Sequence, residues 1–333
     1  MILILSGSND RHAIHVAEQL RQRGASVVSF NPARFPREAQ VSLSYTPAGM
    51  VRQLLCVDGQ EIDLAGLQAV WYRRPEKPIA PSAVHDRSAR AFVEQECSMF
   101  VQDLWSSLNC FWLPAAPYIV RHGEQKAAQL KVAGELGFEL PPTTITNRPA
   151  DLIEFYRQHD GRIVSKQASK AFFDTVGTSF IRYTELVTTR DLAHAGDIAY
   201  CPMIFQAYVA KQVELRITVV GRQVFAAEIH SQATNHTRHD WRRYDHGQTP
   251  HLPHVLPHDV EQRCVRLVEK MGLSYGAIDM VVTPDGRYVF LEINPNGQYL
   301  WIEQEAGLPI SDAICDLLLT RPPDRTRATR EVQ

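Results

Sequence analysis

Near the C-terminus, two apolar runs stand on either side of a short turn-forming sequence. The runs cover residues 275–282 and 288–294, and the turn between them contains Pro284-Asp285-Gly286. This pattern predicts a β-hairpin. If the last two turn residues form a two-residue loop, Asp279 in the first strand lies directly opposite Glu292 in the second, with Cβ atoms roughly 5 Å apart.

Asp279, Glu292 and Asn294 would then form one set of oxygen donors. Asn294 shares the face of Glu292, because side chains two residues apart in a strand point the same way. Like charges opposite each other are unfavourable, so the carboxylates need a cation, and hard oxygen ligands suit Mg²⁺ shared with substrate phosphates. The alternative is the polar outer face of an exposed hairpin. The strands are apolar on both faces, which favours the metal site.

The composition limits the classes of protein to which this chain can belong. The chain has 333 residues, 44% hydrophobic and 22% charged, which is typical of a soluble enzyme with two or three lobes. Its formal net charge of -2 predicts no nucleic-acid partner and no membrane partner. The chain begins with a strand pattern and no apolar run reaches about 18 residues, so we expect neither a signal peptide nor a transmembrane helix. Six cysteines without a CxxC pair predict reduced thiols in a cytoplasmic protein.

The first part of the chain predicts a small α/β lobe. A strand, a helix and a strand over residues 2–5, 11–23 and 25–30 form a β-α-β unit. The G-x-G-x-x-G sequence of dinucleotide sites is absent, so we expect no nucleotide at this first turn. A proline-rich stretch over residues 111–120 marks a lobe boundary. Further elements expected in this lobe are strands over residues 41–45, 51–57, 61–64 and 67–72 and a helix over residues 88–108.

The rest of the chain alternates helices and strands. Residues 230–258 are polar and contain seven histidines, which predicts a long loop across a site. The histidine spacing fits no common zinc pattern, although one histidine could serve as a general base. The charged residues 321–333 predict a disordered tail. Other elements expected here are helices over residues 124–136, 259–271 and 309–319, strands over residues 162–167 and 203–209, and a hairpin over residues 215–228.

The order of these motifs resembles the ATP-grasp ligase superfamily between about residues 118 and 319. A lysine helix, a lysine strand, a linker strand, an E-x-R hairpin, an arginine-bearing loop and the D…E-x-N hairpin follow one another. The resemblance implies an α/β protein with an ATP-grasp fold and an N-terminal pre-ATP-grasp domain. The implied division is residues 1–117 for that domain, 118–202 for a central lobe, 203–320 for a C-terminal lobe with the metal site, and 321–333 for the tail.

Two segments resemble the graspetide (microviridin-type) macrocyclising peptide ligases. They are Trp71-Tyr72-Arg73-Arg74-Pro75, with Arg34-Phe35-Pro36 before it, and the sequence Leu-Glu-Ile-Asn-Pro-Asn-Gly-Gln-Tyr-Leu-Trp over residues 291–301. This resemblance implies an ATP-dependent enzyme that joins Asp or Glu side chains of a precursor peptide to Thr or Ser hydroxyls, or to Lys amines. It implies a leader peptide bound in a groove beside the central lobe. A homodimer is a further expectation for this chain.

The resemblance also assigns residues to ATP and Mg²⁺. Asp279, Glu292 and Asn294 match the metal ligands. Lys126 and Lys166 match the two phosphate-binding lysines. Lys126 has the alternative of an exposed helix lysine, whereas Lys166 is a charge within an apolar strand and needs a partner.

The adenine, ribose and transferring phosphate have their own implied residues. Glu214 matches the ribose ligand, with a solvated hairpin end as the alternative, and Arg216 on the same face meets phosphate or the substrate carboxylate. Arg242 matches the loop arginine that stabilises the acyl phosphate, and its neighbour Arg243 has the alternative of a surface charge. The hinge strand contacts adenine through its backbone, with an ordinary core strand as the alternative. Its residues are Gln206, Ala207, Tyr208 and Val209.

One loop departs from the family pattern. Residues 168–179 hold a single glycine, where relatives carry several that cover the phosphates. This loop could serve the phosphates or the peptide. Two other functions stay open for the whole chain: a ligase that adds an amino acid such as glutamate to a protein or small molecule, and an inactive module that only binds a nucleotide or peptide.

Overall fold

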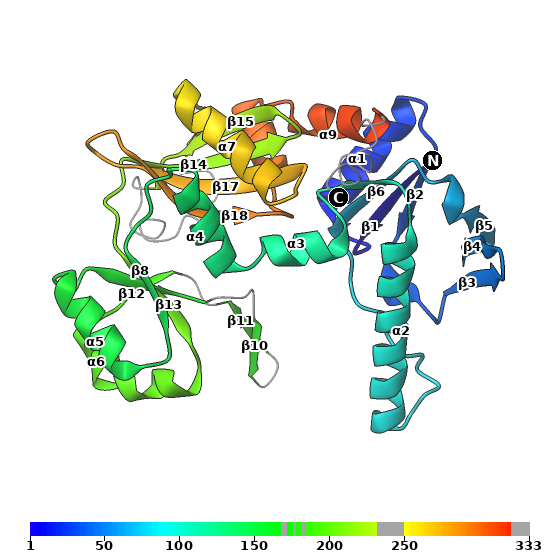
Figure 1. Cartoon of the computed structure of the whole chain (residues 1–333), viewed down its shortest axis with the longest axis horizontal. Helices are drawn as coiled ribbons and strands as arrows, with labels where there is room; N and C mark the ends of the chain where they lie inside the picture. The colour runs from blue at the N-terminus through cyan, green and yellow to red at the C-terminus, as the bar shows by residue number, and fades with distance from the viewer. Residues whose placement is uncertain (168–171, 176–177, 182–183, 232–249, 321–333) are drawn as a thin grey trace, which may run out of the picture.

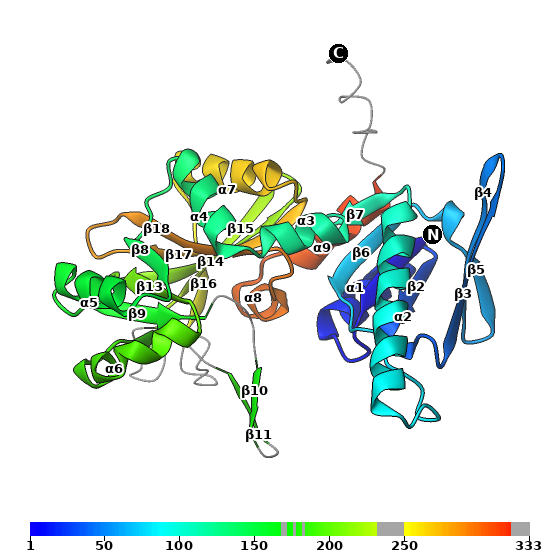
Figure 2. The ribbon, with the colours of Figure 1, turned by 60° about the horizontal axis from the view of Figure 1, so that its bottom comes forward.

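The computed structural model describes residues 1–167, 172–175, 178–181, 184–231 and 250–320. Figure 1 shows the N-terminal sheet at one end of the molecule and the central lobe at the other, with the C-terminal sheet between them. Figure 2 shows the same order after a turn about the horizontal axis. Within these ranges, no helix is both long and apolar enough to cross a membrane.

The N-terminal sheet is parallel, in the order β2-β1-β6-β7. Asp10 caps the following helix, because its carboxylate accepts the backbone N–H groups of His12 and Ala13. This confirms the predicted β-α-β start. The elements are β1 (Ile2–Ser6), α1 (Arg11–Gln22), β2 (Val27–Phe30), β6 (Ala69–Arg74) and β7 (Phe111–Leu113).

Both faces of this sheet are covered, as alternating strand residues show. Leu3 and Val70 pack toward α2 (Arg87–Ser107) and the antiparallel sheet β3-β4-β5. Ile4 and Trp71 pack on the opposite face with α1 and with two helices from the far end of the chain. The N-terminal sheet therefore shares its core with the C-terminus. The elements are β3 (Ala39–Thr46), β4 (Gly49–Val57), β5 (Gln60–Asp63), α8 (Leu300–Ala306) and α9 (Ile310–Leu319).

The central lobe is a sheet in the order β12-β9-β13-β8, with helices packed on it. β13 (Met203–Ala207) follows the predicted boundary at residue 202, yet it pairs with β8 and β9 and lies in this sheet. The hairpin of β10 and β11 extends away from it (Figure 2). The other elements are β8 (Thr143–Thr146), α5 (Pro149–Gln158), β9 (Ile163–Lys166), β10 (Phe172–Thr175), β11 (Thr178–Ile181), β12 (Glu185–Leu186) and α6 (Thr189–Ala193).

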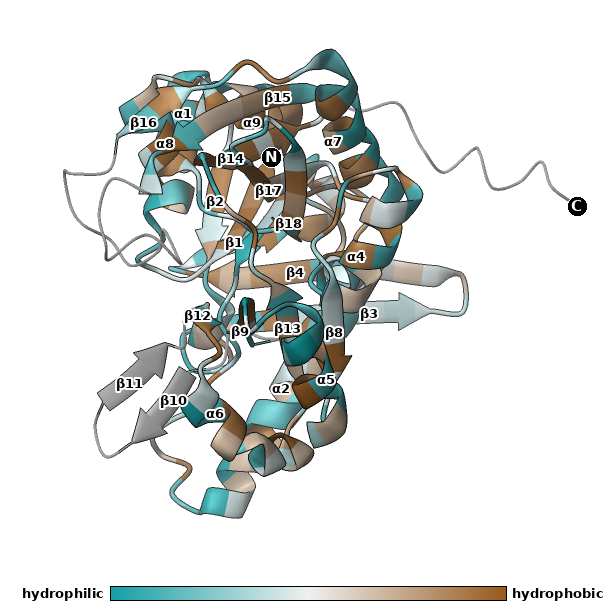
Figure 3. Ribbon diagram, turned by 90° about the vertical axis from the view of Figure 1, so that its left-hand side faces the viewer, coloured by the Kyte–Doolittle hydropathy of each residue, from teal (hydrophilic) through white to brown (hydrophobic). Residues whose placement is uncertain are grey.

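The C-terminal sheet is antiparallel, in the order β16-β15-β14-β17-β18. Leu215, Ile278 and Phe290 line one face, where they pack against α4 and α7. Figure 3 shows the middle strands of this sheet in brown, as expected for strands buried on both faces. The elements are α3 (Pro117–Gly123), α4 (Lys126–Glu135), β14 (Val213–Val220), β15 (Gln223–Ile229), β16 (His251–Pro253), α7 (His258–Lys270), β17 (Tyr275–Val282) and β18 (Tyr288–Asn294).

The hairpin of β17 and β18 pairs Asp279 with Glu292 as predicted, but without a two-residue loop. The loop is longer, and Thr283 N–H donates to the carbonyl of Arg287 across it at 3.0 Å. Next to this loop, the strand partners are one residue out of the predicted register. An irregularity beside Asp279 adds one residue to β18 and restores the pairing. The predicted pairing is right at the site, and the predicted turn is wrong.

Candidate active site

A row of charged side chains crosses three neighbouring strands of the C-terminal sheet. Arg216 on β14 lies opposite Asp279 on β17, which lies opposite Glu292 on β18. Arg216 Nη1 is 2.8 Å from Asp279 Oδ1, and Lys126 Nζ, at the start of α4, is 2.7 Å from Glu292 Oε2. The two carboxylates are therefore flanked by two cations, and the row lies on the face turned away from α7.

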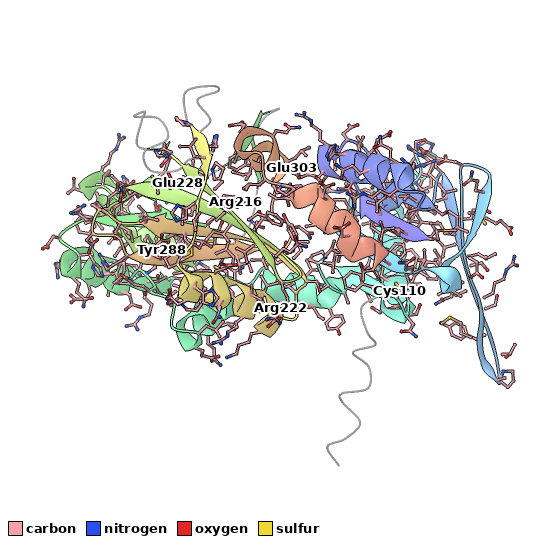
Figure 4. All side chains as sticks on the ribbon, turned by 90° about the horizontal axis from the view of Figure 1, so that it is seen from above. Cys110, Arg216, Arg222, Glu228, Tyr288 and Glu303 are labelled. Atoms are coloured by element: carbon pink, nitrogen blue, oxygen red, sulfur yellow. The ribbon has the colours of Figure 1, made fainter. Side chains whose placement is uncertain are left out.

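Arg216 is the most deeply buried member of this row, at 4% exposed. Figure 4 shows it within the molecule on the C-terminal sheet, whereas Arg222 lies near the surface. Burial alone would lower the pKa of Arg216, but the charge and hydrogen bond of Asp279 outweigh burial and raise it. Arg216 stays protonated and supplies a fixed positive charge beside the carboxylates.

The donor set of Asp279, Glu292 and Asn294 fits a hard cation. Asn294 follows Glu292 by two residues in β18 and pairs with Ala277. β17 is buried along its length apart from the half-buried Asp279, so the exposed-hairpin alternative is wrong. Among the described residues, no three His, Cys, Asp or Glu side chains cluster as metal ligands. Mg²⁺ does not require such a cage, because water and phosphate oxygens complete its coordination.

Lys126 and Lys166 both have partners, but on different lobes. The pairing of Lys126 with Glu292 excludes the alternative of an exposed helix lysine. Lys166 ends β9, and its Nζ lies 2.6 Å from Gln206 Oε1. Gln206 Nε2 in turn donates to Thr143 Oγ1 at 3.0 Å. The ammonium group of Lys166 is thus hydrogen-bonded to Gln206, which is itself hydrogen-bonded to Thr143 on the next strand of the central sheet.

The predicted hinge segment runs out of β13 toward the C-terminal sheet. Ala207 N–H donates to the carbonyl of Pro142, and Tyr208 N–H donates to the carbonyl of Arg162. These two N–H groups support the strand, so Val209 is the next candidate for a backbone donor to a ligand.

Glu214 lies two residues before Arg216 on the same face of β14 and is only 5% exposed. Its Oε1 is 2.9 Å from Lys211 Nζ and accepts a hydrogen bond from Ser231 Oγ at 2.7 Å. The solvated-hairpin alternative is therefore wrong. Glu214 is held in place beside the hinge.

Arg242 and Arg243 lie outside the described residues, as does most of the histidine-rich segment. At its ends, Glu228 joins two histidines: Oε2 is 2.9 Å from His230 Nε2, and Oε1 is 2.7 Å from His254 Nδ1. His254 Nε2 lies 2.9 Å from the Tyr288 hydroxyl. β16, inside the predicted loop, adds a fifth strand to the sheet. In the loop over residues 168–179, only the backbones of β10 and part of β11 are described.

Gln129 is a site residue that the sequence prediction missed. It is buried on α4, and its Nε2 donates to the carbonyl of Ile293 at 2.8 Å, between the two ligands on β18. Its Oε1 accepts the N–H of Ile293 at 3.3 Å. Its position three residues after Lys126, on the same helix face, was the available signal.

The segment after Asn294 packs tightly over the charged row. Arg216 Nη2 donates to the carbonyl of Gln298 at 2.9 Å, and the Tyr275 hydroxyl donates to the carbonyl of Gly297 at 2.8 Å. A Cβ at Gly297 would lie 2.2 Å from the Ala277 Cβ and 2.9 Å from Arg216 Nη2. Only glycine fits at this position.

We expect Gly297→Ala to destabilise the protein by about 1–3 kcal/mol, because the added methyl group overlaps a buried strand. The measurement is the free energy of unfolding in urea. Gly196→Ala is the matched control, since nothing lies within 4 Å of a Cβ there. Equal stability of the two variants would contradict this packing.

Comparison with known proteins places this geometry in a family. Residues 1–119 match the MvdD pre-ATP-grasp domain, and residues 124–318 match the RimK-like ATP-grasp domain. The structure is similar to macrocyclase MdnC from Microcystis aeruginosa, solved with precursor peptide MdnA. The TM-score is 0.86 and the identity 34%, over 96% of this chain and 99% of that one.

Two further proteins are similar to this chain. A Chryseobacterium gregarium RiPP-associated ATP-grasp ligase, solved with ADP and a leader and core peptide, has a TM-score of 0.89 and 30% identity, over 97% of this chain and 98% of that one. Human N-acetylaspartylglutamate synthase A is 24% identical over 143 residues, which is 41% of this chain but only 36% of that protein. The chain is thus a member of the RimK-like ATP-grasp ligase family, with an MvdD-type pre-ATP-grasp domain at its N-terminus.

Proposed function

We propose that the protein is an ATP-dependent peptide macrocyclase. It activates Asp or Glu side chains of a precursor peptide and joins them to Thr or Ser hydroxyls as ω-esters, or to Lys amines as ω-amides. The observation that carries the reaction class is the row Arg216, Asp279, Glu292 and Lys126, which sets two carboxylates between two cations. The substrate class is supported by similarity over nearly the whole chain to two ligases solved with peptides.

The reaction has two steps. A peptide carboxylate oxygen attacks the γ-phosphorus of ATP, so that an acyl phosphate forms and ADP leaves. A hydroxyl oxygen or amine nitrogen of the same peptide then attacks the acyl carbon, phosphate leaves with the bonding electron pair, and the nucleophile loses a proton. The net change in the peptide is the loss of one water per ring.

Each assigned residue has a part in this proposal. The backbone of residues 206–209 binds adenine, and the Glu214 carboxylate accepts hydrogen bonds from the ribose hydroxyls. Lys126 and Lys166 neutralise phosphate charge. Asp279, Glu292 and Asn294 hold Mg²⁺, which when bound supplies charge neutralisation to the transferring phosphate.

Arg216 and Arg242 are the proposed catalytic residues. Arg216 is held at a fixed place by Asp279 and stabilises negative charge that develops beside the ligand set. Arg242 acts on the acyl phosphate.

We expect Arg242→Ala to lower turnover more than ATP affinity, because its proposed contact is with transferring charge.

A residue-adding ligase is the second candidate function. The match of 143 residues to N-acetylaspartylglutamate synthase A supports it, but this covers only 41% of the chain. The N-terminal domain and its match to macrocyclase-type proteins favour the peptide substrate.

Intact-mass spectrometry decides between these candidates. The protein is incubated with Mg²⁺, ATP and a precursor peptide that has a leader and a core rich in Thr and in Asp or Glu. We expect stepwise loss of one water mass per ring. Stepwise gain of a supplied amino acid would indicate the residue-adding ligase, and unchanged mass with ATP consumption would contradict the peptide substrate.

The metal ligands are tested by isosteric amides. Asp279→Asn and Glu292→Gln should each lower kcat by about 100-fold or more, because each removes one ligand charge and the ionic partner of its neighbouring cation. The fold should be retained, but the melting temperature should fall most for Asp279→Asn, because buried Arg216 loses its ionic partner. Asp285→Asn, in the exposed turn of the same hairpin, is the matched control. Wild-type ATP consumption by either ligand variant would refute the metal assignment.

We also propose a cytoplasmic location and a homodimer. All six cysteines lie within the described ranges and are free thiols, as expected in a reducing compartment. The N-terminal end of α2 extends beyond the N-terminal sheet (Figure 2), and the helix exposes Phe92 and Met99 two turns apart on one face. A second copy of the chain is the proposed cover for this face.

Light scattering after size exclusion tests the homodimer. We expect a dimeric mass for the wild type and a monomeric mass for Phe92→Glu, because a charge at this position opposes burial. Tyr45→Glu changes a similarly exposed aromatic residue on β3 and should leave the dimer intact. A monomeric mass for the wild type would refute the proposed homodimer.

A further inference from the structure

Two arginines of the N-terminal domain contact the segment that follows the metal ligand Asn294. Arg73 Nη1 donates to the carbonyls of Asn296 at 2.6 Å and Gly297 at 3.1 Å. Arg74 donates to the carbonyl of Asn296 from Nε at 3.2 Å and from Nη2 at 2.9 Å. Two guanidinium groups from β6 therefore meet at a backbone stretch more than 200 positions away in the sequence.

The arginine side chains are themselves fixed. Arg73 is 1% exposed, and its Nε lies 3.4 Å from Asp10 Oδ2. Asp10 is the N-cap of α1, so this carboxylate is held by the helix as well. Burial lowers the pKa of Arg74 to about 10, which still leaves it charged at neutral pH. The guanidinium groups present their N–H donors in a fixed geometry that an ammonium group cannot copy.

The same domain holds the next residues through His12. His12 Nε2 accepts the backbone N–H groups of Tyr299 at 3.1 Å and Leu300 at 3.2 Å. A ring nitrogen that accepts carries no proton, so the imidazole is neutral with its proton on Nδ1. Burial lowers the pKa of His12, which agrees with this form. The start of α8 is thus anchored to α1.

The C-terminal lobe holds the other side of the segment. Arg216 and Tyr275 donate to the carbonyls of Gln298 and Gly297, and Gln129 holds Ile293 just before Asn294. Residues 293–300 therefore have partners from both domains. Side chains that orient metal ligands in this way govern metal affinity, and their loss typically costs 10–100-fold.

We propose that Arg73 and Arg74 are positioning residues for the metal site, through which the N-terminal domain fixes Asn294. This inference rests on the proposed function, in which Asn294 is a ligand. It adds that the affinity for a divalent cation depends on a domain that supplies no ligand. The two segments that carry the resemblance to peptide macrocyclases are those that meet in this contact.

If Arg73 and Arg74 only held the two domains together, weakening any interdomain arginine contact would have the same effect on Mn²⁺ binding. Arg23 provides the control for this alternative. Arg23 also bridges the domains, since it runs from the end of α1 to Asp312 and Asp316 on α9. It does not contact residues 293–300. Arg23→Lys therefore weakens an interdomain arginine contact without touching the metal site.

The test is a titration of the full-length protein with Mn²⁺ in the presence of ADP, followed by the electron paramagnetic resonance signal of free Mn²⁺. We expect Arg73→Lys and Arg74→Lys to raise the Kd for Mn²⁺ by about 10–100-fold. Arg23→Lys should stay within about twofold of the wild type, since its contact lies away from the ligands. The melting temperature of each variant is measured in parallel.

Asp279→Asn separates failure of this inference from failure of the proposed function. If Asp279→Asn weakens Mn²⁺ binding but both β6 variants bind Mn²⁺ like the wild type, the positioning role is overturned and the metal site stands. If Asp279→Asn also binds normally, the metal assignment and this inference both fall. If Arg73→Lys does not fold, the Kd for Mn²⁺ of Arg74→Lys, at the half-buried Arg74, decides whether the positioning role holds.

Discussion

The opposed carboxylates of Asp279 and Glu292 are the constraint on which the site depends. Two negative charges on neighbouring strands repel, and in a half-buried place the repulsion is weakly screened. The structure compensates with a cation on each flank, Arg216 on β14 and Lys126 on α4. These four side chains come from the start, the middle and the end of the ATP-grasp region. Bringing them together requires the C-terminal sheet, α4 and the segment above them to fold as one unit.

The N-terminal domain is part of that unit. One face of its parallel sheet packs against α8 and α9, so the beginning and the end of the chain share one hydrophobic core. The carboxyl end of β6 then lies next to the segment after Asn294, and Arg73 and Arg74 contact its carbonyls. The usual place for ligands in a parallel sheet is this carboxyl edge. Here the edge supports the ligand-bearing segment of another lobe.

Strongly patterned elements could be predicted from the sequence. The hairpin, the β-α-β start and the lysine strand all follow from local periodicity and turn residues. The pairing of Asp279 with Glu292 was predicted from a two-residue loop that does not exist; a longer loop and a bulge cancel each other. The helix α8 and the strand β16 were missed, because α8 depends on contacts with His12 and β16 on pairing with β15.

By itself, the sequence determined which residue types lie in which local element, and hence that two carboxylates and an amide share one face of a hairpin. Local spacing suffices for this, because strand geometry fixes side-chain direction every second residue. The tertiary structure alone decided that Lys126 reaches Glu292, that Gln129 holds Ile293, and that β6 holds the segment beyond Asn294. These contacts join residues far apart in the chain, and such contacts follow from packing of whole elements rather than from local pattern.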